Sequence, residues 1–314
     1  MAAPRALVTG AGGFIGRWSV APLLARGFEV HAVLSPDAAR AVPEELTGAV
    51  LHRADLLAQG AAAALCGAVR ATHLLHFAWI AAPGVYWTSP DNGRWLEAGG
   101  RLLQAFADHG GARAVLAGSC AEYDWTRAGV CREFTTPLAD AHGGTVSPYA
   151  AAKLALQREL AAVGARRGLS AAWGRIFFQY GPHEHPQRLV PSVVCSLLAG
   201  SEALCTQGTQ RRSFLHVADV GAAFAALLDS TLAGPVNIGA AEPVAIADLV
   251  MMIGAALGRP DLVRLGARPT PAGEPDLIVP DVARLQDELG WRPRWDLPAG
   301  LADTIAWWRR RGIA

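Results

Sequence analysis

The sequence lacks the features that mark several classes of protein. Its five cysteines show no Cys-x-x-Cys spacing, which disfavours a zinc site, and their odd number disfavours a closed set of disulfides. We therefore expect reduced thiols and no bound metal. The cysteines are Cys66, Cys120, Cys131, Cys195 and Cys205.

Long apolar runs and an excess of charge are also missing. The 314 residues are 52% hydrophobic, but alanine raises this fraction and no stretch is long enough to span a membrane. The chain runs into its first apolar segment without a secretion signal. A formal net charge of +1 gives no reason to expect nucleic acid or a membrane as a partner. We expect a cytoplasmic protein.

A glycine-rich turn lies near the start of the chain. Residues 9–16 read Thr-Gly-Ala-Gly-Gly-Phe-Ile-Gly, after the apolar run 6–8 and before the periodic segment 14–25. A buried strand, a tight glycine turn and a helix predict a dinucleotide site, because the helix N-terminus faces the phosphates. The spacing Gly-x-x-Gly-x-x-Gly is looser than Gly-x-Gly-x-x-Gly, and a plain turn is the alternative.

Tyr149 and Lys153 are four residues apart in Ser-Pro-Tyr-Ala-Ala-Ala-Lys, residues 147–153. On a helix they share one face, so we expect the ammonium of Lys153 beside the phenol of Tyr149. A nearby cation favours phenolate and lowers the pKa of tyrosine toward the working pH, as acid/base catalysis requires. An exposed helical pair is the alternative, and the upstream glycine turn favours catalysis.

Strand-like and helical segments alternate through the first part of the chain. The strand-like runs are 28–34, 49–53, 73–77, 114–118 and 170–178. This alternation predicts an α/β fold with a doubly wound parallel sheet of the Rossmann type. We expect a dinucleotide-binding domain from residues 1–180, to which 213–240 return, and a smaller substrate-binding lobe from 181–212 and 241–314.

Taken together, these motifs resemble the extended short-chain dehydrogenase/reductases, in the branch of NAD-dependent epimerases, dehydratases and 4-ketoreductases of sugar nucleotides. The resemblance covers nearly the whole chain. Besides the glycine turn and the Tyr149/Lys153 pair, it rests on Asp55-Leu56, His76-Phe77-Ala78, Gly118-Ser119, Tyr180-Gly181-Pro182, Leu189-Val190-Pro191, Gln210-x-Arg212-x-Phe214, Val217-x-Asp219-Val220, Asn237-Ile238-Gly239 and Leu289-Gly290-Trp291.

The resemblance implies roles for individual residues. Tyr149 is the expected acid/base, Lys153 holds the nicotinamide ribose, and Ser119 hydrogen-bonds the reacting oxygen. An ordinary turn is the alternative for Ser119, and a helix N-cap is the alternative for Asp55, which is expected to bind adenine. The expected cofactor-binding residues are Gly10, Gly13, Phe14, Ile15, Gly16, Asp55, Leu56, Phe77, Ala78, Tyr149 and Lys153.

The choice between NAD and NADP depends on the end of the second strand. Members that prefer NAD usually carry an acidic residue there, where this chain has Leu34 followed by Ser35. The missing acid favours NADP, with Ser35 and Arg40 as contacts to the 2′-phosphate. NAD stays possible because Asp37 is close by.

The resemblance also implies a nucleoside diphosphate sugar as substrate. Arg212 and Arg268 are expected at the diphosphate, because a guanidinium pairs well with phosphate oxygens. A solvated loop is the alternative for Arg268 and His183, and core packing is the alternative for Trp79. The expected substrate-binding residues are Trp79, Ser119, Cys120, Phe178, His183, Val190, Arg212 and Arg268.

The residues after Ser119 restrict the reaction. The family's 4,6-dehydratases carry an Asp-Glu pair where this chain has Cys120 and Ala121. Its 3,5-epimerase/4-reductases have a cysteine at position 121, and Cys120 would face the opposite side of a strand. Trp95 replaces an asparagine that relatives keep. We therefore expect an oxidoreductase of deoxysugar biosynthesis that reduces the carbon-4 ketone with NADPH.

Three further expectations stay open at this point. The alternatives in function are a 4-epimerase that retains NAD and a dinucleotide-binding regulator without activity. Relatives imply a homodimer through a four-helix bundle, and intramolecular packing is the alternative for the residues on its expected outer face. These residues are Leu102, Phe106, Leu156 and Leu160.

Overall fold

The computed structural model describes residues 3–37, 42–127, 129–141 and 146–312. At its centre lies a seven-stranded sheet in the order β12-β7-β5-β4-β1-β2-β3, with every neighbouring pair parallel. This confirms the predicted doubly wound α/β fold. Its strands are β1 (Arg5–Thr9), β2 (Glu29–Leu34), β3 (Val50–Arg53), β4 (His73–His76), β5 (Arg113–Ser119), β7 (Ser170–Ile176) and β12 (Gly234–Ile238).

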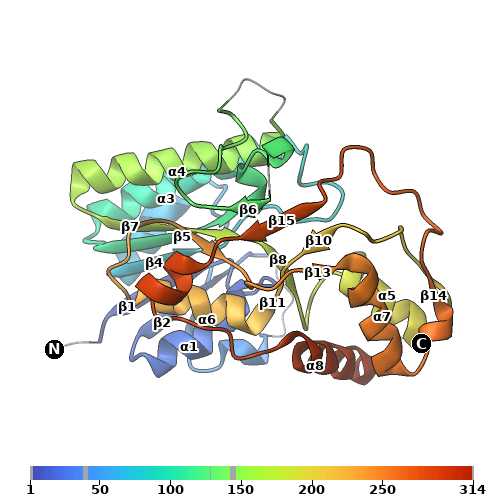
Figure 1. The fold of residues 1–314 in the computed structure, drawn as a ribbon. Helices are drawn as coiled ribbons and strands as arrows, with labels where there is room; N and C mark the ends of the chain where they lie inside the picture. Colours follow the sequence, from blue (N-terminus) through green and yellow to red (C-terminus); the bar gives the residue numbers. More distant parts are fainter. Residues whose placement is uncertain (1–2, 38–41, 128, 142–145, 313–314) are drawn as a thin grey trace.

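Helices cover both faces of this sheet (Figure 1). One face packs against α2 (Ala61–Val69), α3 (Asp91–Asp108) and α4 (Pro148–Arg167), and the other against α1 (Val20–Ala25) and α6 (Val217–Leu228). Leu7 and Leu74 pack into the apolar core between the sheet and α2, α3 and α4. Their neighbours Val8 and Leu75 pack into the core between the sheet and α1 and α6. Because successive side chains of a strand point to opposite faces, burial on both faces explains the unbroken apolar runs.

Two expectations about helices were wrong. The segment 14–25 does not form one helix: Gly16–Ser19 is a 3₁₀ helix and α1 begins only at Val20. Leu102, Phe106, Leu156 and Leu160 do not form an outer face either, because each is at most 2% exposed inside the core between the sheet and α3/α4. A dimer through α3 and α4 stays a prediction and would need other residues.

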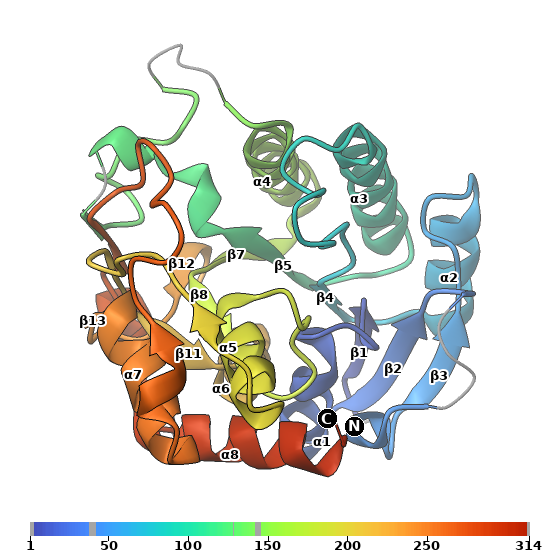
Figure 2. The same cartoon turned by 90° about the vertical axis from the view of Figure 1, so that its right-hand side faces the viewer.

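Helix α4 is fixed at both ends by its own sequence. The Ser147 hydroxyl accepts a hydrogen bond from the Ala150 amide, Pro148 occupies the first turn, and Gly168 ends the helix in the left-handed conformation. These caps place Tyr149 in the first turn of α4, the helix that lies beside α3 on one face of the sheet (Figure 2).

The further elements are α5 (Leu189–Leu198), α7 (Ile246–Leu257), α8 (Leu297–Arg310), β6 (Val130–Cys131), β9 (Ala203–Leu204), β10 (Arg211–Arg212), β13 (Val244–Ala245), β14 (Val263–Arg264) and β15 (Leu277–Pro280). Helices α5, α7 and α8 pack beside the sheet around a separate apolar cluster that includes Val194, Leu249 and Ile305, whereas Cys131 of β6 and Ile278 of β15 belong to a further small cluster. Here β8 (Phe178–Tyr180) pairs with β11 (Phe214–His216). Within the described ranges, no helix has both the length and the apolar character needed to cross a membrane.

Candidate active site

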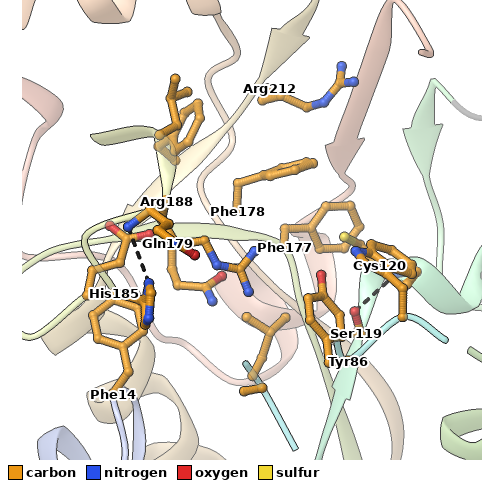
Figure 3. Close-up of a pocket in the computed structure, with 18 of the residues that line it drawn as sticks. Phe14, Tyr86, Ser119, Cys120, Phe177, Phe178, Gln179, His185, Arg188 and Arg212 are labelled. Carbon is orange, nitrogen blue, oxygen red and sulfur yellow. Dashed lines mark hydrogen bonds between the residues drawn. The ribbon is translucent and has the colours of Figure 1, made fainter. Parts of the chain in front are cut away.

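A cavity of about 860 Å³ opens at the carboxyl ends of the central strands, where a doubly wound sheet binds its ligands. The sheet side contributes residues that follow β1, β4, β5 and β7, and the opposite wall comes from segments between residues 178 and 274. Figure 3 shows side chains from both walls pointing into this space, with Ser119 and Tyr86 on one side and Gln179 and Arg188 on the other.

The glycine turn forms one end of the cavity. Gly10 has a φ of +68°, and a Cβ atom there would lie 2.7 Å from the Ala78 backbone nitrogen. A Cβ atom on Gly16 would lie 2.3 Å from the Gly10 carbonyl oxygen. Only glycine permits this close backbone approach, which a dinucleotide pyrophosphate requires. Seven of the residues expected at the cofactor line the cavity here: Gly10, Gly13, Phe14, Ile15, Gly16, Phe77 and Ala78.

Ser119, Tyr149 and Lys153 line the same cavity, but the lysine does not contact the phenol as expected. Its Nζ donates to the Ala117 carbonyl oxygen at 2.9 Å and lies 3.8 Å from the ring centroid of Trp79. The ring centroid of Tyr149 is 5.9 Å away. The cation is therefore held by β5 and an indole face.

Burial controls the protonation of this pair. It raises the pKa of Tyr149, against the effect of a hydrogen bond to the Ser119 side chain. The expected lowering of the pKa of tyrosine is therefore wrong for this structure. Burial also lowers the pKa of Lys153 to about 7, against the effect of the Glu122 carboxylate. At neutral pH the phenol carries its proton, as a proton donor must.

An aromatic wall surrounds Tyr149. The rings of Tyr86 and Trp87 meet it edge to face, with centroids 4.8 and 5.7 Å away. Asn92, which is 1% exposed, fixes this wall. Its amide oxygen accepts from the Trp79 indole at 2.9 Å, and its amide nitrogen donates to the Tyr86 carbonyl at 2.7 Å. A role for Asn92 was not predicted from the sequence, although this residue directly follows Ser-Pro-Asp, residues 89–91, where α3 begins.

The segment after Ser119 is a 3₁₀ helix, Cys120–Glu122. Cys120 and Ala121 both line the cavity, so the expectation that Cys120 faces away, which assumed a strand, was wrong. Burial nevertheless raises the pKa of the Cys120 thiol, and no thiolate base results.

The far end of the cavity contains three of the residues expected to bind the substrate, two of them at its diphosphate. Phe178, Arg212 and Arg268 all line it. Arg212 is 2% exposed, donates to the Glu274 carboxylate and places its guanidinium 5.4 Å from the Phe178 ring centroid. Arg188, which was not predicted, also lines the cavity, 5.3 Å from the Tyr86 ring centroid.

Two expected substrate contacts lie elsewhere. His183, with a φ of +71°, accepts a hydrogen bond from Arg17 at 2.8 Å and donates to Glu45 at 2.7 Å, outside the lining of the cavity. Val190 is 1% exposed in the apolar cluster of α5 and α7. The sequence alone does not reveal that the local backbone directs these two side chains away from the cavity.

Three residues expected at the adenosine end, Ser35, Asp55 and Leu56, are not part of the cavity lining. The Asp55 carboxylate accepts from the Leu57 amide at 3.0 Å, as a capping residue does, and Leu56 is buried. Ser35 is exposed, and Arg40 lies outside the described residues. Leu34 packs so close to the glycine turn that a Cβ on Gly12 would be 2.8 Å from it. The assigned roles of these residues stay predictions.

The described ranges contain no group of three His, Cys, Asp or Glu side chains placed to hold a metal. What they do contain is a dinucleotide-type glycine turn and a Ser/Tyr/Lys set in one cavity. The sequence model of the NAD dependent epimerase/dehydratase family matches residues 6–239. The chain belongs to this family.

Other members of the epimerase/dehydratase family show what the chain is similar to. A dTDP-4-dehydro-6-deoxy-D-allose reductase from a Streptomyces species is 37% identical over 123 residues, which are 39% of this chain and 37% of the reductase. The match thus spans well under two thirds of that relative.

Solved structures of family members match over almost the full length. A dTDP-glucose 4,6-dehydratase from Streptomyces venezuelae with bound NAD has a TM-score of 0.82 and 27% identity, and the match covers 98% of this chain and 97% of that one. A UDP-glucose 4-epimerase from Thermus thermophilus in complex with NAD also has a TM-score of 0.82, with 29% identity and coverage of 97% and 99%.

Proposed function

We propose that the protein reduces the carbon-4 ketone of a nucleoside diphosphate 4-keto-6-deoxyhexose with NADPH. The bound dinucleotide supplies the hydride to carbon 4. Tyr149 donates its phenolic proton to the ketone oxygen, and Ser119 hydrogen-bonds the alkoxide that develops there. The products are the alcohol and the oxidised dinucleotide, so atoms and electrons balance.

The observation that carries this proposal is the segment after Ser119. Dehydration needs acid/base groups beside the serine, and here Cys120 and Ala121 face the cavity while the Cys120 thiol stays neutral. Glu122, the nearest carboxylate in sequence, is fully buried and is not part of the lining. The segment after Ser119 thus adds no acid or base to Tyr149, and one proton donor beside the serine suits ketone reduction.

The same proposal includes the substrate-binding lobe, residues 181–212 and 241–314. Arg212 and Arg268 from this part of the chain line the cavity and would bind the diphosphate, with Phe178 beside Arg212. The reductase relative acts, by its name, on a dTDP-linked 4-keto-6-deoxy sugar, which agrees with this substrate class. For the cofactor, Leu34 in place of an acid supports NADP over NAD.

A 4-epimerase is the second candidate, because the structure resembles a UDP-glucose 4-epimerase. The two functions differ in how the dinucleotide behaves. An epimerase recycles a tightly held NAD, whereas a reductase consumes NADPH from solution.

The test is to incubate the protein with dTDP-, GDP-, CDP- and UDP-linked 4-keto-6-deoxyhexoses and either NADPH or NADH. The proposal predicts loss of reduced dinucleotide in step with formation of a carbon-4 alcohol. Protein that copurifies with stoichiometric NAD and interconverts carbon-4 epimers without consuming NADPH would instead establish the epimerase.

A further inference from the structure

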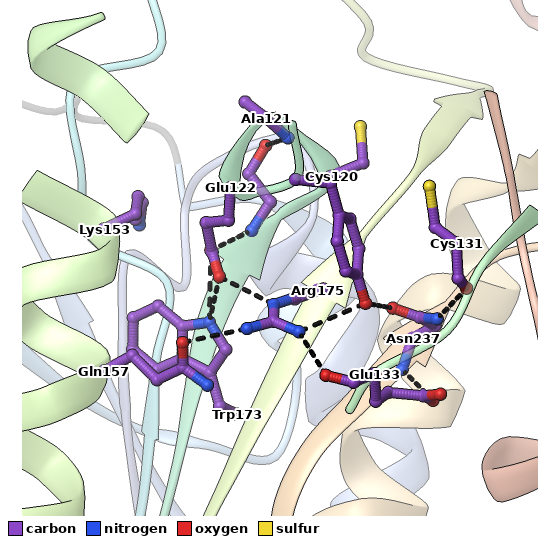
Figure 4. A network of polar contacts seen from close by, with 12 residues as sticks. Cys120, Ala121, Glu122, Cys131, Glu133, Lys153, Gln157, Trp173, Arg175 and Asn237 are labelled. Carbon is purple, nitrogen blue, oxygen red and sulfur yellow. Dashed lines mark hydrogen bonds and ion pairs between the residues drawn. The ribbon is translucent and has the colours of Figure 1, made fainter. Parts of the chain in front are cut away.

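A buried polar network joins Glu122, Trp173 and Arg175 (Figure 4). Glu122 is 0% exposed and forms an ion pair with Arg175, itself 1% exposed, at 2.8 Å. The same carboxylate accepts from the Ser119 backbone amide at 2.7 Å and from the Trp173 indole at 2.9 Å. Glu122 is thus bonded to the residue that carries the reacting hydroxyl, through the reciprocal contacts of a capping box.

The residue before Ser119 leaves room for this arrangement. A Cβ atom on Gly118 would lie 2.6 Å from the Glu122 carboxylate and 2.1 Å from the Trp173 indole nitrogen. The carboxylate therefore approaches the strand more closely than any residue but glycine at position 118 allows. Arg175 holds it there and donates on its other side to the Gln157 amide and the Glu133 carbonyl.

The charge of Glu122 also acts on Lys153, where it opposes the loss of the ammonium proton. The other titratable groups around the lysine carry no charge that could replace it. Tyr149 and Cys120 stay neutral because burial raises the pKa of each. His76 on β4 is neutral because burial, assisted by the charge of Lys153, lowers its pKa to about 3.

We propose that Glu122 is a positioning residue of the reaction, which fixes the Ser119 backbone, is itself held in place by Arg175, and presents its charge to Lys153. This inference rests on the proposed function, in which Ser119 and Lys153 serve the transfer of hydride and proton. It assigns a role to a carboxylate that touches neither substrate nor cofactor.

The sequence provides a direct measurement. Lys153 is the only lysine in the chain. Protein labelled with ¹³C- and ¹⁵N-lysine therefore gives a single side-chain signal, whose titration reports this ammonium without any substrate. In Glu122→Gln we expect the midpoint to fall by about one pH unit. In Arg175→Gln the midpoint should fall as well, because a buried carboxylate that loses its counter-ion takes up a proton, and its charge then no longer acts on Lys153.

A fall in both variants that a control variant does not share is the critical result, because a general packing defect would move the midpoint of the control as well. Glu133→Gln is the matched control: it alters a buried carboxyl of the same network that is not among the charges acting on Lys153, and it should leave the midpoint unchanged. If Glu122→Gln does not fold, a downward shift in Arg175→Gln that is absent from Glu133→Gln decides. Unchanged midpoints in the folded variants would overturn the proposal.

Activity gives the second measurement. The rate of ketone reduction by Glu122→Gln should fall about fivefold at neutral pH and recover near pH 5, where the lysine is protonated in both proteins. A loss that is equal at every pH would show a purely structural role. If the wild-type protein reduces no keto sugar while the lysine midpoints shift as expected, the proposed function fails and the charge coupling stands.

Discussion

Replacing Tyr149 with Phe removes one oxygen atom from the centre of the cavity. The ring contacts with Tyr86 and Trp87, 4.8 and 5.7 Å between centroids, do not involve that oxygen. The hydrogen bond to the Ser119 side chain is lost. One such bond contributes about 1 kcal/mol to folding, so the variant should fold with nearly wild-type stability.

The effect on the rate should be much larger. A positioned acid contributes about 10²- to 10⁴-fold, which corresponds to about 3–5 kcal/mol of barrier. We expect Tyr149→Phe to lose this factor in kcat for ketone reduction, followed by the loss of NADPH absorbance. Binding of NADPH, followed by quenching of tryptophan fluorescence, should stay close to that of the wild type.

Ser119→Ala provides the comparison. It removes a donor to the same oxygen, which should cost about 10²- to 10³-fold. Because both groups act on one oxygen and contact each other, the double variant should lose less than the product of the two single losses. A Tyr149→Phe protein that binds NADPH and turns over at the wild-type rate would refute the assignment of Tyr149 as the proton donor.

Three further substitutions test other parts of the structure. Gly10→Ala should abolish dinucleotide binding in calorimetry, because its Cβ would lie 2.7 Å from the Ala78 backbone at a φ of +68°; normal affinity would contradict the predicted pyrophosphate site. Leu34→Asp should shift the ratio of kcat/KM values toward NADH by about tenfold, since a carboxylate can bind ribose hydroxyls and repels a 2′-phosphate; an unchanged ratio would remove the argument for NADP. Burial raises the pKa of Glu184 from 4.5 to about 8, so this group makes folding less favourable as the pH rises between those values. Glu184→Gln should therefore melt like the wild type near pH 5 and a few degrees higher above pH 8, and a gap of constant size would contradict the burial argument.

The central sheet could be predicted because its signals are local. Runs such as 114–118 are apolar because both faces of the strand are covered, and a glycine turn between a buried strand and a helix is typical of this fold. The site was only partly predictable because several contacts join distant residues. Lys153 bonds to the carbonyl of Ala117, 36 positions away, and Arg175 reaches Glu122 across 53 positions. No periodicity in the sequence encodes such pairs.

His183 shows a second reason for failure. Its place after Tyr-Gly-Pro suggested a substrate contact, but a positive φ turns its ring toward Arg17 and Glu45. Backbone conformations of this kind are rare outside glycine, and residue type alone does not reveal them.

The single lysine has a consequence for the outer surface. Lys153 is 4% exposed, and every other residue in the Lys+Arg total of 28 is an arginine. The protein thus presents no lysine amine to solvent. Reagents and enzymes that acylate lysine can react only with Lys153, which lines the cavity. The rate at which that amine is acylated, and its protection by a bound dinucleotide, would report how accessible the cavity is to solvent.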